Sequence, residues 1–369
     1  MIHCRHFSVC GGCSLPNVPY AEQLALKRAQ LSGLLKLDVP PLVPSPRDER
    51  FRHKVAFVFG ADASGRRIVM GHYAAQTRTI VPIDECPVHS DRGNQLAFGL
   101  RDELVRARVP PALLRHVLIR TTESGREAVV MLVVTRNDRV LRAPVRAFLS
   151  RKNPPDGFFV NVHDRPGPAM VGRETIRIAG RAHAREDALG ASFLIGPTAF
   201  FQTNVGAAGE VLRIVMDEVA SAKTVLDLYS GSGLFTVPMA ASGTSVTAVE
   251  EHPQASEDAA RNLRLNRVPD DRVRLIRARV EHALPRLSRA HFDAVVIDPP
   301  RQGCAAPVLL AIVQDLKPPR LIYVSCNPQI LAVDIPLIRR AGYTIARLQP
   351  IDMFPHTEHI ETVVTFDRD

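Results

Sequence analysis

The stretch TVLDLYSGSGLF (224–235) decides the fold of the second half of the chain, because in it an apolar strand runs directly into a glycine-containing loop. Gly231 and Gly233 permit a tight turn and a close approach of the backbone to a ligand. The spacing differs from the G-x-G-x-x-G pattern of dinucleotide folds, and no Gly-Lys-Ser/Thr triplet marks a phosphate-binding loop. The loop therefore predicts a ligand that needs close backbone contact but no phosphate clamp.

An acidic residue ends the next predicted strand. Glu250 lies 23 positions after Asp227, where a carboxylate can accept hydrogen bonds from both hydroxyls of a ribose. A glycine loop combined with such an acid suits S-adenosylmethionine better than NAD. An ordinary turn between strand and helix is the alternative, and Asp298-Pro-Pro at a later strand end favours cofactor binding over it.

Strands and helices alternate on the carboxyl-terminal side of this loop, over residues 191–369. The apolar runs TSVTAVEE, RVRLIRA, FDAVVIDPP and RLIYVSCNP read as strands, and Pro253 to Leu265 reads as a helix. This alternation predicts a doubly wound α/β domain, in which ligands bind beyond the carboxyl ends of the strands.

Residues 1–190 have a different pattern, typical of a mainly β domain. KVAFVFG, RRIVMGHY and TRTIVPI are short β-rich runs, and residues 116–134 read as a hairpin that turns at 123–125. A helix is expected in 19–37, with one apolar side formed by Leu24, Leu31, Leu34 and Leu35. We expect residues 1–90 to hold a cysteine segment and the first strands, and 91–190 to form a central, mainly β domain.

Charge is unevenly distributed in a chain whose net charge is +9. Residues 1–190 hold 29 Lys and Arg against 18 Asp and Glu, whereas residues 191–369 hold 18 against 20. The excess predicts that the first half, including the central β domain of 91–190, faces a nucleic acid such as RNA, with Arg52 and Lys54 as candidate phosphate contacts. A generally arginine-rich composition is the alternative. With no apolar signal segment and no apolar run of about 18 residues, we expect a cytoplasmic protein without a membrane partner.

A cysteine ends the strand in LIYVSCNPQILAVD (321–334). Isolated cysteines usually pack as small hydrophobic residues, and we expect this of Cys304. Cys326 differs because it follows a strand, precedes Asn-Pro and falls at the same predicted sheet edge as Asp298 and Glu361. A thiol is a strong nucleophile even when only a few per cent is ionised, so Cys326 is a candidate nucleophile.

Together these segments resemble the S-adenosylmethionine-dependent RNA uridine-C5 methyltransferase family. The similar motifs are FFQTN (200–204), DLYSGSGLF (227–235), IDPPRQG (297–303), SCNP (325–328) and FPHTEHIETVV (354–364). The resemblance implies a Rossmann-like class I methyltransferase domain over 191–369. It also implies that Cys326 is the nucleophile and Glu361 the base, and that the cofactor is contacted by Gln202, Tyr229, Glu250 and Asp298. We expect His356 and His359 to be surface or structural residues.

The chemistry of the family explains these residue types. C5 of uridine is a poor nucleophile until a thiol adds to C6, after which C5 can attack a sulfonium methyl group. A carboxylate must then remove the C5 proton so that the thiol can leave. Both faces of the base must be reached, so we expect the uridine to be flipped out of its stack or to lie in an unpaired loop.

Four other cysteines lie far from the predicted catalytic edge. Cys4, Cys10 and Cys13 form a C-x5-C-x2-C group, and Cys86 is followed by proline. Four thiolates can hold zinc tetrahedrally or an iron–sulfur cluster. The family resemblance implies a [4Fe–4S] cluster with a structural role; a redox role and unligated cysteines are the alternatives.

The length and cysteine layout resemble the shorter bacterial 23S ribosomal RNA branch of the family most. We therefore expect 23S rRNA as the substrate, with tRNA as the alternative and a monomeric enzyme in either case. A catalytically inert RNA-binding iron–sulfur protein is a further alternative, which the presence of both Cys326 and Glu361 disfavours. Methyltransferases that act on nitrogen usually present Asn-Pro-Pro and need no cysteine nucleophile, so that class is disfavoured as well.

Overall fold

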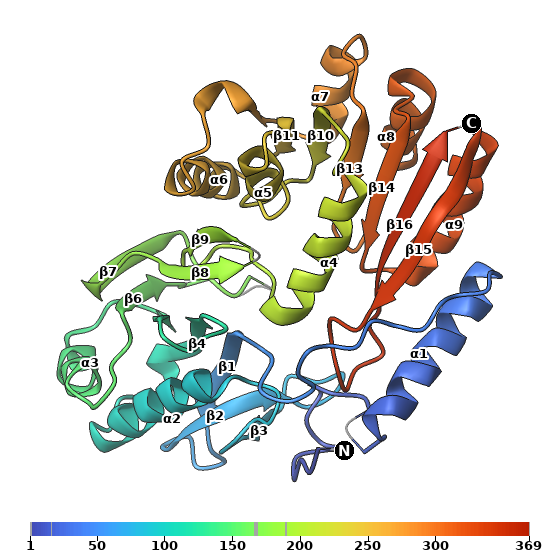
Figure 1. Cartoon of the computed structure of the whole chain (residues 1–369). Helices are drawn as coiled ribbons and strands as arrows, with labels where there is room; N and C mark the ends of the chain where they lie inside the picture. Colours follow the sequence, from blue (N-terminus) through green and yellow to red (C-terminus); the bar gives the residue numbers. More distant parts are fainter. Residues whose placement is uncertain (1, 16, 166–168, 189, 369) are drawn as a thin grey trace.

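The computed structural model describes residues 2–15, 17–165, 169–188 and 190–368. Two large sheets organise the molecule, one from each half of the chain, and they form two lobes (Figure 1). Helix α4 (Val205–Glu218) lies between the lobes, directly after the segment that joins them (Figure 1).

The sheet of the first half, here called the amino-terminal sheet, has seven strands among the described residues, in the order β3-β2-β1-β4-β5-β6-β7. Its strands are β1 (Lys54–Ala61), β2 (Ile68–Tyr73), β3 (Ile80–Pro82), β4 (Leu114–Thr121), β5 (Ala128–Val134), β6 (Gly157–Val162) and β7 (Glu174–Gly180). The predicted hairpin is confirmed, because β4 and β5 pair and the Thr122 amide donates to the Glu127 carbonyl at 2.9 Å. Strands from the predicted ranges 1–90 and 91–190 share this one sheet.

Two helices cover one face of the amino-terminal sheet. Val55, Phe57 and Phe59 alternate along β1 and pack in one core with α2 (Asp91–Arg106) and α3 (Arg142–Leu149). These helices were not predicted from the sequence, although Ser90 is a preferred N-cap residue and its side chain accepts from the Gly93 amide at 3.2 Å. Two short 3-10 helices, η1 (Pro111–Leu113) and η2 (Arg139–Leu141), lead into β4 and α3.

The carboxyl-terminal sheet has the order β12-β11-β10-β13-β14-β16-β15 in the described part of the chain. Its strands are β10 (Thr224–Leu228), β11 (Ser245–Glu250), β12 (Val273–Arg277), β13 (Ala294–Ile297), β14 (Arg320–Ser325), β15 (Tyr343–Ile351) and β16 (Glu361–Arg368). Five neighbouring strands of this sheet are parallel to one another: β12, β11, β10, β13 and β14. Strand β16 is antiparallel to both of its neighbours, β14 and β15. The predicted strands are confirmed, and their carboxyl ends meet at one edge.

Helices cover both faces of this sheet, because its buried strands are apolar on both sides. Val225 of β10 packs in the core with α4, α5 (Thr236–Ala241) and α6 (Pro253–Leu265). Leu226 and Leu228 of the same strand point into the opposite core. The helical segments on that side are α7 (Val280–Leu287), α8 (Ala306–Leu310), the π-helical turn η4 (Ala311–Leu316) and α9 (Pro328–Arg340); η3 (Asp270–Arg272) precedes β12. The helix predicted from Pro253 to Leu265 is confirmed.

Two elements from the first 195 residues pack on the carboxyl-terminal lobe. Helix α1 (Tyr20–Leu35) lies along α9, close to β15 and β16 (Figure 1). The hairpin of β8 (Ala184–Ala188) and β9 (Ala191–Ile195) packs on α6. The Ser192 and Leu194 amides of β9 donate to the side chains of Asn266 and Asn262, each at 2.8 Å. Among the helices of the described residues, none combines the length and apolar character needed to cross a membrane.

Candidate active site

The glycine loop after β10 has left-handed backbone conformations, which glycine residues adopt readily. Gly231 and Gly233 have φ values of 57° and 91°, and Tyr229 has a φ of 63°. The Gly231 amide donates to Oε2 of Glu250 at 2.9 Å, and the His252 amide donates to Oε1 at 2.6 Å. Glu250 therefore fixes the loop and still has lone pairs for the hydroxyls of a ribose.

Two carboxyl groups lie at the ends of the neighbouring strands β10 and β13. Asp227 is fully buried, and its Oδ2 accepts from Thr236 Oγ1 at 2.5 Å, while its Oδ1 has no hydrogen-bond partner among the described residues. Burial raises the pKa of Asp227 to about 7. Burial, with the nearby Asp227, also raises the pKa of Asp298 to about 7. An orphaned buried acceptor beside a second carboxyl group fits a ligand that carries positive charge, as the sulfonium and ammonium groups of S-adenosylmethionine do.

The segment that carries Gln202 is held from the amino-terminal sheet. Arg120 of β4 is only 3% exposed, and its guanidinium donates to the carbonyls of Phe201 at 3.1 Å and Gln202 at 3.2 Å. The His53 amide donates to the Thr203 carbonyl at 2.7 Å. The sheet of the first half thus sets the backbone around Gln202, which is half-buried.

Cys326 and Glu361 meet at the edge formed by β14 and β16. In their antiparallel register Ser325 lies opposite Thr362, so the next pair along the strands is Cys326 and Glu361. Glu361 is 6% exposed, and Cys326 is half-buried. The turn after Cys326 is fixed because Asn327 Oδ1 accepts from the amides of Gln329 and Ile330 at the start of α9.

Electrostatic interactions link both side chains to Asp298 and Arg301. Burial raises the pKa of Cys326 to about 11, with further contributions from the carboxyl groups of Glu361 and Asp298. Burial and Asp298 also hold the pKa of Glu361 well above its usual range. The guanidinium of Arg301 lowers both pKa values and so favours the ionised forms. Sequence reasoning did not single out Arg301, although it lies three positions after Asp298 in the same motif.

The remaining predicted structural side chains lie as expected. Cys304 is 6% exposed within the core beside α8, and its Sγ is 3.7 Å from the Tyr229 hydroxyl. His356 is completely buried, and the ring of His359 packs against the ring of Phe354 at a centroid distance of 5.9 Å. The structure therefore confirms a packing role for Cys304 and a structural setting for His356.

The four amino-terminal cysteines line one cavity of about 170 Å³, together with Arg52, His72 and His89. Burial is the main cause that raises the pKa of Cys13 to about 12 and that of Cys86 to about 11, and the neighbouring cysteines add to both shifts. In the described residues no group of three or more His, Cys, Asp or Glu side chains is already arranged to hold a metal ion. The set of four thiols around one cavity nevertheless fits the ligands of a zinc ion or an iron–sulfur cluster.

The doubly wound sheet, the glycine loop with its acidic partner and the carboxyl groups at the strand ends define a Rossmann-like, S-adenosylmethionine-dependent methyltransferase. The family model described as tRNA (Uracil-5-)-methyltransferase matches residues 19–369. The chain belongs to this family.

Relatives and a solved structure agree with this membership. An RNA methyltransferase of Gloeobacter violaceus, described as uncharacterized, is 33% identical over 97% of this chain and 81% of its own. A similarly described protein of Thermosynechococcus vestitus is 32% identical over 96% and 81%. The crystal structure of the Pyrococcus abyssi tRNA (uracil-54, C5)-methyltransferase with S-adenosyl-L-homocysteine has a TM-score of 0.81 at 28% identity, covering 97% of this chain and 84% of that one.

These similarities confirm the predicted fold class and the predicted family. The protein is an S-adenosylmethionine-dependent RNA uracil-C5 methyltransferase. RNA is accordingly its class of substrate, and the strand-end site described above is the candidate place of the reaction.

Proposed function

We propose that this protein methylates C5 of one uridine in 23S rRNA, with Cys326 as the nucleophile that adds to C6 and Glu361 as the base that removes the C5 proton. The observation that carries the proposal is the register of β14 and β16, which makes Cys326 and Glu361 neighbours at a buried strand end beside Asp298. A thiol and a carboxylate in contact with one base are the two groups that this reaction requires.

The proposed sequence of steps uses each group once. The Cys326 thiolate forms a bond to C6 of uracil, and the C5–C6 electron pair moves to C5 and O4. When bound, S-adenosylmethionine would supply a methyl group on a positively charged sulfur; the sulfur–methyl bond breaks as the C5–methyl bond forms, and the neutral thioether S-adenosylhomocysteine is left. Once C5 carries the methyl group, Glu361 takes the C5 proton, and its electron pair rebuilds the C5–C6 double bond. Cys326 then leaves as the thiolate, so the enzyme recovers its starting state after the carboxyl group loses its proton.

The raised pKa values are consistent with this division of roles. A carboxyl group with a pKa held well above its usual range is a stronger base than an exposed carboxylate when it is ionised. Cys326 instead needs its pKa lowered, because a thiol with a pKa of about 11 is mostly protonated at neutral pH. Arg301 lowers this pKa, and we propose that it stabilises the thiolate.

For the cofactor we propose four contacts at the strand ends: Gln202, Tyr229, Glu250 and Asp298. Glu250 would accept from the ribose hydroxyls, and Asp298 would face the positively charged amino-acid part. The fixed glycine loop and the orphaned Oδ1 of Asp227 support this arrangement.

For the amino-terminal cysteines we propose a [4Fe–4S] cluster held by Cys4, Cys10, Cys13 and Cys86. Its role would be structural, because the proposed reaction transfers no electrons. The cavity that all four thiols line supports the proposal.

The identity of the RNA substrate is the most specific part of the proposal. The +11 charge of residues 1–190 supports RNA binding by the first half of the chain, and the four-cysteine set supports the 23S rRNA branch. Transfer RNA is the second candidate, favoured by the family description and by the similarity to the Pyrococcus abyssi tRNA (uracil-54, C5)-methyltransferase.

The test is mass spectrometry of nucleosides after reaction with methyl-labelled S-adenosylmethionine. Unmodified 23S rRNA and unmodified tRNA are supplied separately, and the Cys326→Ala protein serves as the control. Labelled 5-methyluridine in 23S rRNA supports the proposal as stated. Label in tRNA alone would move the substrate to tRNA, and a label on another base or atom would overturn the proposed reaction.

A further inference from the structure

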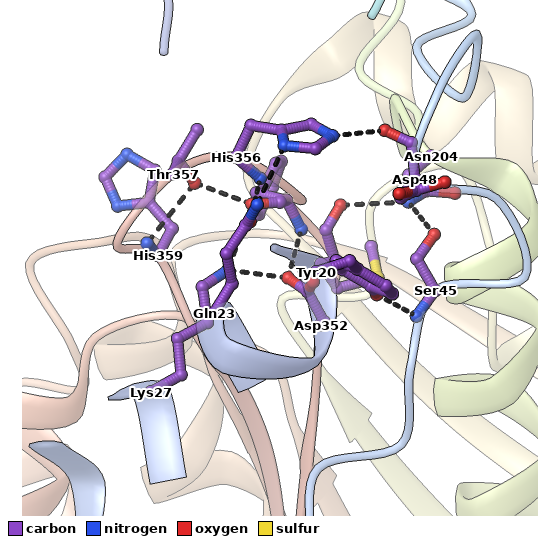
Figure 2. Close-up of polar contacts among 12 residues, drawn as sticks. Tyr20, Gln23, Lys27, Ser45, Asp48, Asn204, Asp352, His356, Thr357 and His359 are labelled. Atoms are coloured by element: carbon purple, nitrogen blue, oxygen red, sulfur yellow. Dashed lines mark hydrogen bonds and ion pairs between the residues drawn. The ribbon is translucent and has the colours of Figure 1, made fainter. Parts of the chain in front are cut away.

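The loop of residues 352–360 connects β15 to β16 and ends directly before Glu361. It is unusually well anchored for a connection, and Figure 2 shows its polar contacts. Three of its contacts come from segments more than 300 positions earlier in the chain, near the amino terminus.

One face of α1 packs against this loop over most of the length of the loop. The three buried residues of α1 are Gln23, Lys27 and Leu31, spaced four apart and so on one side of the helix. Lys27 Nζ donates to Asp352 Oδ1 at 2.7 Å and to the Phe354 carbonyl at 3.1 Å. Leu31 packs in one apolar cluster with Ile360, the residue before Glu361.

His356 is the centre of the loop's contacts (Figure 2). Its amide donates to Gln23 Oε1 at 2.8 Å, and Gln23 Nε2 lies 3.0 Å from its Nδ1. Its Nε2 lies 2.7 Å from the Asp48 carbonyl oxygen. One protonation state satisfies both ring contacts: Nδ1 accepts from the Gln23 amide and Nε2–H donates to Asp48. Burial lowers the pKa of His356, which agrees with this neutral form.

The backbone of His356 is held in a conformation that side chains seldom adopt. Its φ is 65°, and such a conformation persists only where surrounding contacts determine it. Its carbonyl accepts from the amides of Ser14 at 3.0 Å and Leu15 at 2.9 Å, directly after Cys13. The cysteine segment and α1 therefore converge on this one residue, five positions before Glu361.

The rest of the loop is fixed in the same way. Asn204, next to the segment with Gln202, donates through Nδ2 to the Met353 carbonyl at 3.1 Å. Thr357 Oγ1 donates to the Phe354 carbonyl at 2.7 Å and accepts from the His359 amide at 3.3 Å. A buried polar network of this kind specifies a single conformation, because any displacement leaves buried donors and acceptors unpaired.

We propose that Gln23 and His356 are positioning residues for catalysis: they fix the 352–360 loop so that Glu361 faces the base attached to Cys326. This inference rests on the proposed roles of those two residues and adds a function for the first helix of the chain. The step that depends on Glu361 is removal of the C5 proton, after methyl transfer. Loosening the loop therefore slows that late step more than it slows addition or methyl transfer.

The experiment uses three variants of the full-length protein in single-turnover reactions with RNA and methyl-labelled cofactor. Gln23→Met keeps the length of the side chain and removes its amide. His356→Asn keeps a residue that tolerates a positive φ and removes the ring contacts. The matched control is Asn161→Leu, because Asn161 is a buried amide with several hydrogen bonds between β6 and β7, remote from the loop. Each protein is assayed at the same interval below its own midpoint of thermal unfolding.

The two measured quantities are the rate at which label enters RNA and the rate at which labelled RNA is released from its covalent complex with the protein. For Gln23→Met and His356→Asn we expect release to slow about tenfold to a hundredfold, as slight misplacement of a catalytic group does. The methylated covalent complex then accumulates, and it does not accumulate for Asn161→Leu. Equal slowing of both rates, or accumulation in the control as well, would overturn the positioning role. If the Glu361→Gln protein itself forms no such complex, the proposed mechanism fails instead, and the two failures are distinguishable.

Discussion

Lys27 and Asp352 are 325 positions apart in the sequence and form an ion pair of 2.7 Å in which neither side chain is more than 1% exposed. Removing one partner of such a pair leaves a buried charge without compensation. We expect Lys27→Met to lower the free energy of unfolding by about 3–5 kcal/mol in urea denaturation. The double variant Lys27→Met, Asp352→Asn should be more stable than the single one, because it leaves no unpaired charge. A loss below about 1 kcal/mol for Lys27→Met would mean that the pair is not buried in solution.

The pH dependence of the first chemical step should report on Arg301. Its guanidinium lowers the pKa of Cys326, so Arg301→Met should raise that pKa and reduce the thiolate fraction at neutral pH. Each unit by which the pKa of Cys326 rises lowers the thiolate fraction about tenfold. The rising limb of the plot of rate against pH therefore moves to higher pH. The measurement is the rate of covalent complex formation at saturating RNA, from neutral to alkaline pH. Arg301→Lys keeps the charge and should keep the limb near its original position, whereas an unshifted limb in Arg301→Met would remove Arg301 from this role.

The proposed iron–sulfur cluster can be tested by measuring the metal and sulfide content of the protein. Protein purified without oxygen should contain iron and acid-labile sulfide, and Cys86→Ala should lose both and much of its solubility, because metal binding is coupled to folding. Cys304→Ala is the matched control, since Cys304 is equally buried but lies in the core beside α8. One zinc per chain without sulfide would replace the iron–sulfur proposal by a zinc site.

RNA binding should depend on the charge of the first half of the chain. Arg52 and Lys54, our first candidates for phosphate contacts, are only half-exposed, and burial lowers the pKa of Lys54 to about 8. Arg173 and Arg177, near and on β7, are exposed and offer a clearer test. Reversing both charges should weaken RNA binding and reduce the slope of log affinity against log salt by about two, or one for each lost phosphate contact.

The same charge change on the other lobe is the control for that experiment. Arg339 and Arg340 are exposed at the end of α9, in the carboxyl-terminal lobe. Their reversal should leave the salt dependence nearly unchanged. If both double variants weaken binding alike, net charge alone attracts the RNA and the first half has no special part in binding it.

Local sequence patterns predicted the carboxyl-terminal lobe well, and they failed where partners come from distant segments. The strands and the helix from Pro253 to Leu265 have strong periodicity, and their ends follow from local turn and helix-start signals. In α1 the same reasoning found the packed side, since Leu31 is buried and Leu24 and Leu35 pack against its cluster, but it missed the polar residues of that side. Leu24 is only half-buried, whereas Gln23 and Lys27 are buried, because their partners are Asp352 and the loop around it.

The contribution of Arg301 was missed for a similar reason. Its motif indicated a strand end, but its influence on Cys326 and Glu361 depends on the order of β13, β14 and β16 in the sheet. No pattern within one segment specifies that order. The α2 and α3 helices, by contrast, carried local signals such as the Ser90 N-cap and should have been predicted.

The divided roles of Cys326 and Glu361 are tested most directly by incubating Glu361→Gln protein with RNA and methyl-labelled S-adenosylmethionine, followed by denaturing gel electrophoresis. Glutamine keeps the shape of the side chain but cannot take up the C5 proton. We expect a denaturation-resistant protein–RNA complex that carries the methyl label, turnover reduced about 10²–10⁴-fold, and loss of the complex when Cys326→Ala is added. Normal turnover by Glu361→Gln, or a covalent complex that persists without Cys326, would contradict these roles.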